Sequence, residues 1–204
     1  MTPETLISLI GIAFATSLTP GPNNAMLASS GATYGLRATL PHIAGIILGF
    51  PVMIFLVGLG LGEVFRQSQA LQQALRWAGA LMLLWLAWKI AAATPPGEGE
   101  KRGGRPLSFW QSAAFQWINP KGWIAATALS TQFIRPEMLL ATSAVAGLAF
   151  VVSGTVSTFT WAGFGQVLGR WLGTGARLRL FNLSMAALLV GFLVLMLIGR
   201  SGSG

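Results

Sequence analysis

Six long apolar stretches run through this chain, and the few polar residues inside them are not spaced to form the solvent face of a soluble helix. Each stretch holds at least about 20 residues, enough to cross a hydrocarbon core of about 30 Å as a helix. The pattern therefore predicts an all-α integral membrane protein with six transmembrane helices. The stretches lie at about 4–33, 38–62, 70–92, 109–133, 138–165 and 178–198.

One polar stretch, Thr94–Pro106, divides the chain almost in half, and its proline, glycine and charge density cannot form a packed element. We expect a single transmembrane domain over 1–204, with one repeat at about 4–92, a linker at about 93–108 and a second repeat at about 109–198. Three helices on each side of the linker would run in opposite directions, as in an inverted repeat. The alternative is that any six-helix protein with a central loop divides in this way.

The first apolar stretch is interrupted by Pro20, Gly21 and Pro22, and two asparagines, Asn23 and Asn24, follow. Proline removes a backbone donor and blocks the carbonyl four residues earlier, so the helix must break. Free amides that begin a half-helix favour an anion, and free carbonyls that end one favour an ammonium. We interpret these five residues as substrate-binding. The alternative is a proline kink whose backbone groups a neighbouring helix satisfies.

A second break is predicted at Asn119, Pro120 and Lys121, 98 residues after the matching proline of the first. Asparagine suits the N-cap and proline the first helical position. A lysine at mid-membrane costs about 2.5–3.5 kcal/mol and is a functional candidate by default, the alternative being one that extends to the interface. We interpret the three residues as substrate-binding. Trp117 and Trp123 bracket the break, and either line the pocket or serve only in packing.

The charge content agrees with a membrane protein, because only 9% of residues are charged, 53% are hydrophobic and the mean hydropathy is +0.67. A soluble domain carries about 25% charged residues. With six crossings, eight of the basic residues fall at the linker side and four at the other. The positive-inside rule then places the linker in the cytoplasm and both termini in the periplasm. Cytoplasmic loops that face anionic lipid explain the net charge of +8, so the charge does not indicate nucleic-acid binding.

Several kinds of chemistry are disfavoured. The chain has no cysteine, which removes Cys-ligated metals and iron–sulfur clusters, and its acidic residues fall at the ends of the predicted spans or in loops. We therefore expect no metal, no cofactor and no enzymatic activity. If a proton moves with the substrate, its candidate carriers are Lys121 and His42. For His42, the more ordinary interpretation is a histidine at the membrane interface with its nitrogens satisfied.

Glycines recur at four-residue spacing at the end of the first stretch and in the second, at Gly31, Gly35, Gly45 and Gly49. Small residues at this spacing predict close packing of membrane helices. The alternative is a smooth face along which helices slide during gating.

The two interrupted motifs resemble the signatures of the LysE/RhtB family of amino-acid exporters. The likeness covers nearly the whole chain and rests on Thr19-Pro20-Gly21-Pro22-Asn23, the four glycines and Asn119-Pro120-Lys121. Stretches such as Trp85-Leu86-Ala87-Trp88-Lys89-Ile90 and Thr127-Ala128-Leu129-Ser130-Thr131 are similar to the cysteine and O-acetylserine exporter subgroup. The resemblance implies efflux of amino acids or close derivatives through the bacterial inner membrane, driven by an ion gradient.

Together these features predict a secondary transporter that works by alternating access. Lys121 and the free amides would hold the substrate carboxylate, while Asn23, Asn24 and the carbonyls near Leu18 would hold its amino group. The expected partners are an amino acid, the lipid bilayer and a coupling ion, with a proton as one candidate and a homodimer as one open assembly state. The alternatives are an exporter of another amino acid, such as homoserine or threonine, and a non-transporting membrane scaffold.

Overall fold

A computed structural model describes residues 1–93, 105–173 and 175–198, and every regular element in those ranges is a helix, as predicted. The predicted linker lies mostly outside the described residues. The elements are α1 (Pro3–Leu18), α2 (Pro22–Leu56), the π-helical turn η1 (Val57–Leu61), α3 (Gly62–Gln67), α4 (Gln69–Ala91), α5 (Phe109–Ile118), α6 (Pro120–Phe133), the 3-10 turn η2 (Pro136–Met138), α7 (Leu139–Leu172) and α8 (Ala176–Ile198).

Within the described residues, four helical stretches are long and apolar enough to cross a membrane: Pro22–Gln67, Gln69–Ala91, Pro136–Leu172 and Ala176–Ile198. The two predicted breaks are both present. Helix α1 ends at Leu18 and α2 begins at Pro22, while α5 ends at Ile118 and α6 begins at Pro120. Proline occupies the first helical position of both α2 and α6, where its missing N–H leaves no helical bond unmade.

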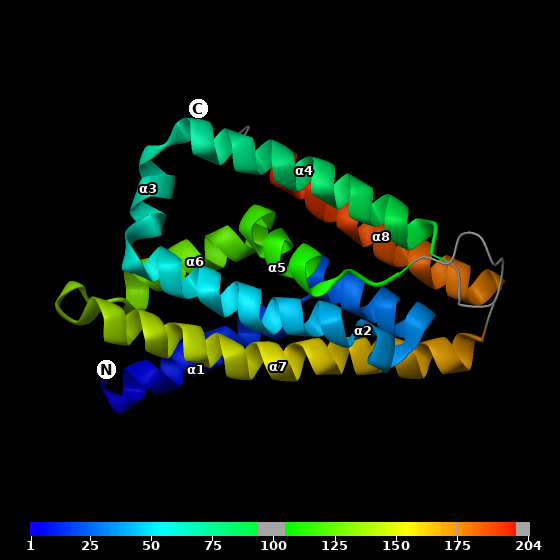
Figure 1. Cartoon of the computed structure of the whole chain (residues 1–204), viewed down its shortest axis with the longest axis horizontal. Helices are drawn as coiled ribbons and strands as arrows, with labels where there is room; N and C mark the ends of the chain where they lie inside the picture. The colour runs from blue at the N-terminus through cyan, green and yellow to red at the C-terminus, as the bar shows by residue number, and fades with distance from the viewer. Residues whose placement is uncertain (94–104, 174, 199–204) are drawn as a thin grey trace.

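Helix α2 is two helices joined by a sharp turn at Gly35, where φ is 80° and ψ is 165°. Only glycine adopts this backbone conformation readily, so the turn depends on the missing side chain. Beyond the turn the chain folds back, and the hydroxyls of Ser30 and Thr39 meet at 2.9 Å (Figure 1). The packing interpretation is therefore wrong for Gly35, which marks the boundary between the first and second predicted segments.

Close packing does explain the other three glycines. A Cβ on Gly31 would overlap the carbonyl of Ala162 in α7, and one on Gly45 would overlap the side chain of Ser112 in α5. A Cβ on Gly49 would lie 2.8 Å from the Cα of Ala113 in α5. The second half of α2 is thus held tightly against α5, and the first half against α7.

The helices lie roughly along one axis, with α4 and α8 packed together on one side and α1 and α7 on the other (Figure 1). Helices α2, α5 and α6 lie between these pairs. Three apolar clusters fill the described interior, around Leu83 and Phe115, around Leu9 and Phe150, and around Leu27 and Ile43. Large apolar side chains also cover the outside of the bundle, as expected for a surface that faces lipid.

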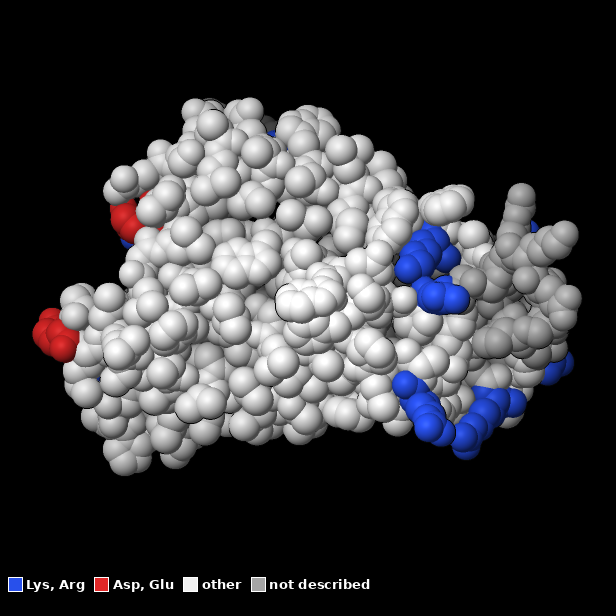
Figure 2. Space-filling model, viewed as in Figure 1, with Lys and Arg blue, Asp and Glu red and all other residues white. Residues whose placement is uncertain are grey.

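The two ends of the bundle differ in charge. At one end, which we call the linker end, α4 and α7 finish and α8 begins; at the other, the α3 end, lie the N-terminus and η2 (Figure 1). Figure 2 shows lysine and arginine side chains gathered toward the linker end and acidic side chains at the α3 end. On the visible face, charged side chains therefore lie mainly toward the two ends of the bundle.

Candidate functional site

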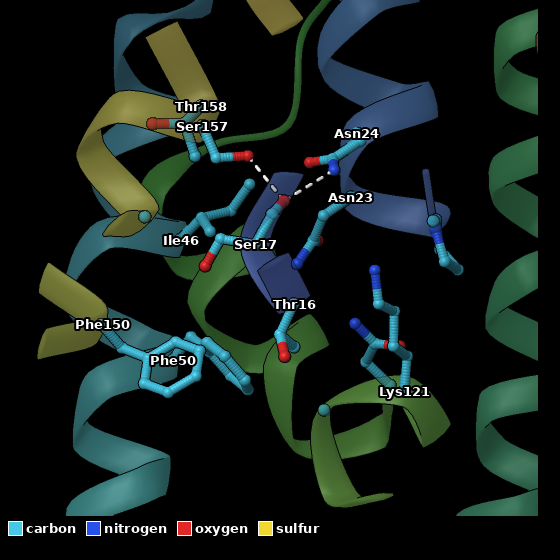
Figure 3. A pocket seen from close by; sticks show the side chains of 15 residues that line it. Thr16, Ser17, Asn23, Asn24, Ile46, Phe50, Lys121, Phe150, Ser157 and Thr158 are labelled. Carbon is cyan, nitrogen blue, oxygen red and sulfur yellow. Dashed lines mark hydrogen bonds between the residues drawn. The ribbon is translucent and has the colours of Figure 1, made fainter. Parts of the chain in front are cut away.

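The two breaks face a shared cavity, the central cavity, with about 560 Å³ of empty space including its mouth. Helices α1, α2, α6 and α7 all contribute to its walls (Figure 3). The lining residues are Thr16, Ser17, Gly21, Pro22, Asn23, Asn24, Ile46, Phe50, Asn119, Lys121, Gly122, Phe150, Gly154, Ser157 and Thr158.

Side chains from two helices cap the carbonyl end of α1. Asn24 donates from Nδ2 to the carbonyls of Ser17 and Thr19, at 2.8 and 2.9 Å. Ser157 of α7 donates to the Ser17 carbonyl at 2.6 Å, so two donors converge on that oxygen (Figure 3). The indole N–H of Trp161 donates to the carbonyl of Leu18 at 3.3 Å. The break therefore leaves its carbonyl end satisfied by protein groups, at positions where lipid could satisfy none.

Lys121 connects the second break to the first. Its Nζ donates to the Thr19 carbonyl at 2.8 Å, and a Cβ on Gly21 would lie only 3.0 Å from its Cδ and Nζ. Glycine at position 21 thus gives the lysine side chain room to reach across. A cation at the carbonyl end of α1 also matches the negative end of that helix dipole.

Neither helix that begins at a break has a side-chain cap. Gly21, the N-cap of α2, has no side chain to offer, and the side chain of Asn119 makes no capping hydrogen bond to α6. The asparagine is 3% exposed, and its Oδ1 has no hydrogen-bond partner among the described residues. Two positive helix ends and one free amide oxygen therefore border the same cavity.

Asn23 pairs with Gln116 of α5 in a reciprocal amide contact. Asn23 donates to Gln116 at 2.9 Å and accepts from it at 3.3 Å, and Gln116 also donates to the Ser112 carbonyl at 2.8 Å. Gln116 is fully buried. This pair joins the first half-helix of α2 to α5, and so it ties together the two segments that carry the breaks.

An apolar wall completes the cavity. Phe50 of α2 and Phe150 of α7 meet edge to face at 5.2 Å between ring centres, at the side of the cavity away from the asparagines (Figure 3). Ile46 lies on the same helix as Phe50, one turn nearer the linker end. A ligand in the cavity would meet polar groups at the breaks and rings beyond them. Small zwitterions with a short side chain fit this division.

Six of the predicted site residues border the central cavity: Gly21, Pro22, Asn23, Asn24, Asn119 and Lys121. Pro20 and Pro120 shape the breaks without lining it. The tryptophans lie elsewhere: Trp123 stacks on Phe65 at 4.2 Å and donates to the Trp117 carbonyl at 2.7 Å. Neither ring lines the central cavity: Trp123 of α6 packs against Phe65 of α3, and Trp117 of α5 meets Trp123 edge to face.

His42 is 1% exposed, and neither of its ring nitrogens has a hydrogen-bond partner among the described residues. The interpretation as a histidine with satisfied nitrogens is therefore wrong. Its imidazole lines a different cavity, nearer the linker end.

Several site residues were missed by sequence reasoning. Ser157 and Thr158 come from α7, whose apolar sequence gave no reason to single them out, and Gln116 pairs with Asn23 from α5. The available signal was a serine pair four residues apart, Ser153 and Ser157, in a helix that is apolar over most of its length. Both meet Ser17, the first through a hydroxyl contact of 3.1 Å.

Long apolar helices, two interrupted segments and a polar cavity where the breaks meet define a multi-pass membrane protein of the translocator class. The sequence profile of the LysE type translocators matches residues 14–200, and the chain belongs to this family.

Among its curated relatives are proteins named cysteine/O-acetylserine efflux protein. Those of Escherichia coli (strain K12) and Shigella sonnei (strain Ss046) are each 36% identical over 194 residues, covering 93% of this chain and 96% of the relative. That of Escherichia coli O139:H28 (strain E24377A / ETEC) is 37% identical over 174 residues, covering 83% and 87%. No solved structure matches the chain.

Proposed function

We propose that this chain exports cysteine, O-acetylserine or a similar small amino acid through the bacterial inner membrane by alternating access, as an ion-driven secondary transporter. The names of its relatives support this substrate class. The single observation that carries the proposal is the central cavity, where two uncapped helix N-termini and Lys121 meet.

The carboxylate of the substrate binds between the helix ends. Residues at the start of α2 and of α6 line the cavity, neither helix has a side-chain cap, and the lining contains no acidic side chain among the described residues. Backbone amides, the positive ends of two helix dipoles and the ammonium of Lys121 all favour an anion there.

The ammonium of the substrate binds at the carbonyl side. Two acceptors there suit it: the Oδ1 of Asn119, which has no partner among the described residues, and the carbonyl of Thr19, which in this structure accepts from Lys121 and Asn24. On binding, Lys121 moves from the Thr19 carbonyl to the substrate carboxylate, and the substrate ammonium takes its place. The sequence predicted that Asn24 binds the amino group of the substrate. Because its side chain caps the Ser17 and Thr19 carbonyls, we assign it instead the role of holding the break open.

This exchange gives substrate binding a structural consequence. The contact between Lys121 and Thr19 joins the segment before the linker to the segment after it. When a bound substrate replaces that contact, the interaction between the two halves of the protein changes. A ligand can shift a conformational equilibrium only if it interacts differently with the two conformations, and this exchange provides such a difference. Six crossings arranged as two inverted repeats, with the interrupted segments as the first and fourth, would then rock about the central cavity.

The linker end faces the cytoplasm in this proposal. Basic side chains gather there, as the positive-inside rule requires, and both described termini lie toward the other end (Figures 1 and 2). Lys121 and His42 remain the candidate proton carriers, and a homodimer remains an open assembly state. The lack of an acidic side chain in the cavity disfavours lysine or arginine as substrate, because a second cation would have no counter-charge.

The test is export by the purified protein in liposomes loaded with labelled O-acetylserine, with and without an imposed proton gradient. Gradient-dependent loss of label that excess cysteine slows is the expected result. A non-transporting scaffold would lose label only as fast as loaded liposomes that contain no protein. A panel with homoserine and threonine separates the substrate alternatives, since the true substrate competes best.

A further inference from the structure

A second cavity of about 340 Å³, which we call the linker-end pocket, lies nearer the linker end. It shares no lining residue with the central cavity. The polar side chains that line it come from both halves of α2, from α4 and from the chain before α5: Ser29, Ser30, Tyr34, His42, Lys89 and Arg105.

The linker-end pocket contains hydrogen-bonding groups that have no partner among the described residues. Ser29 is bonded to Asn182 at 2.8 Å, and Ser30 meets Thr39 at 2.9 Å. By contrast, both ring nitrogens of His42 are buried without a partner among the described residues. A buried imidazole that has given up its water and gained no bond is costly unless a ligand supplies one.

The backbone around this imidazole is fixed. Ser112 donates from its hydroxyl to the carbonyl of His42 at 2.9 Å, and Gly45 lets α5 approach one turn further along. The ring is therefore held in place by its helix, without a bond of its own. This is the arrangement of a binding group that is positioned in advance.

The charge around the pocket has one sign. Lys89, half-buried, and Arg105, exposed, line it, and no acidic side chain does so among the described residues. The ammonium of Lys89 lies 5.3 Å from the centre of the Trp85 ring, which holds it near the pocket without neutralising it. Two cations, an imidazole and the hydroxyl of Tyr34 together favour a carboxylate.

The position of the pocket suggests an order of events. His42 lines the linker-end pocket and Ile46 lines the central cavity, and they lie one helical turn apart on α2. One turn is about 5.4 Å, less than the length of a small amino acid. A ligand that enters at the linker end would therefore meet this pocket immediately before the central cavity.

We propose that the linker-end pocket is a separate binding site for the carboxylate of the exported amino acid, filled before the central cavity. The identity of the ligand and its direction of travel rest on the proposed function. The residues assigned to the site are His42, Lys89, Arg105 and Tyr34.

The test uses the fact that His42 is the one histidine of the chain. Protein labelled with ¹⁵N-histidine and held in a neutral detergent gives imidazole signals that report on this pocket alone. Titration with O-acetylserine should shift them saturably, and the carboxamide of O-acetylserine, which lacks the carboxylate, should not. No saturable shift, or equal shifts with the two compounds, would overturn the proposal.

Substitutions test whether the two basic residues of the linker-end pocket bind the carboxylate. The double substitution Lys89→Gln with Arg105→Gln removes charge at positions that are not fully buried, and should weaken the titration about tenfold. The matched control is Arg37→Gln with Arg170→Gln, which removes two charges at the same end from residues outside the pocket lining and should change the midpoint by less than about twofold. Equal weakening by both pairs would mean general attraction by the charged end, and would refute the site.

A lipid headgroup is the other source of an anion. If phosphatidylglycerol nanodiscs alone produced the shift and O-acetylserine did not displace it, the pocket would be a lipid site and the proposal would fail. The liposome assay separates the two proposals: flux without a shift at His42 removes only this site, and a carboxylate-specific shift without flux removes only the transport function.

Discussion

Lys121 donates its ammonium to the backbone carbonyl of Thr19 at 2.8 Å, across 102 positions of sequence. One residue belongs to the helix that begins at the second break, and the other follows the helix that ends at the first. The lysine thereby places a positive charge at the negative end of the α1 dipole, within a mainly apolar bundle. Any ligand with a carboxylate must compete with that carbonyl for the same ammonium.

Removing the lysine should reduce export by at least about tenfold without preventing membrane insertion. Lys121→Ala deletes the cation that holds the carboxylate, and a charge-assisted hydrogen bond is worth about 1.5–3 kcal/mol, which corresponds to roughly a 10- to 150-fold loss of flux at low substrate. The measurement is initial export in liposomes at matched protein content. The control is Arg170→Ala, which removes a charge at the end of α7, away from the central cavity. Near-normal export by Lys121→Ala would refute the assigned role.

The cap supplied by Asn24 should matter for stability. Asn24→Leu keeps the size of the side chain and removes its bonds to the Ser17 and Thr19 carbonyls. Because each carbonyl keeps a second donor, Ser157 or Lys121, the expected loss in the free energy of unfolding is about 1–3 kcal/mol, not the larger cost of bare carbonyls.

Unfolding in detergent, followed by circular dichroism, measures this loss. Thr160→Val is the matched control, because the Thr160 hydroxyl is exposed and bonds only within its own helix. If the two variants unfolded alike, Asn24 would not be the cap that holds the break.

The sequence was sufficient to locate both breaks, because proline and glycine act on the backbone where they stand. This local chemistry determines where α1 and α5 end and where α2 and α6 begin. Gly35 was singled out in the sequence too, but its four-residue spacing predicted helix packing. The turn that it forms could not be predicted from that spacing.

The partners of the breaks could not be predicted in the same way. A helix that is apolar all round carries no periodic pattern to tell its inner face from its lipid face. Helix α7 comes close to this, since apolar residues lie among both its buried and its exposed positions, so the contact between Ser157 and the Ser17 carbonyl was hidden. The burial of His42 on α2 was hidden for the same reason. The direction in which α6 turns Trp123 also depends on packing against α3, which the sequence does not encode locally.

Helix α7 offers a test of how closely the halves of the bundle pack. A Cβ on Gly165 would overlap the carbonyl of Ala28, whereas one on Gly163, two residues earlier, would meet nothing within 4 Å. Gly165→Ala should lower the free energy of unfolding by about 1–3 kcal/mol. Gly163→Ala should be neutral or stabilise by up to about 1 kcal/mol, since alanine favours helix. Thermal unfolding of the two in one detergent makes the comparison, and equal midpoints would contradict the close contact between α2 and α7.

The orientation can be tested directly because the chain has no cysteine of its own. Ala38, just past the turn at Gly35, is exposed at the linker end, and Glu137 in η2 is exposed at the α3 end. In intact cells, a maleimide that cannot cross the membrane should label Glu137→Cys, and Ala38→Cys only after the membrane is opened. The unsubstituted chain is the blank. The reverse pattern would invert the proposed orientation, because the basic end would then face outward against the positive-inside rule. Labelling of both in intact cells would contradict the placement of the linker end and the α3 end on opposite sides of the membrane.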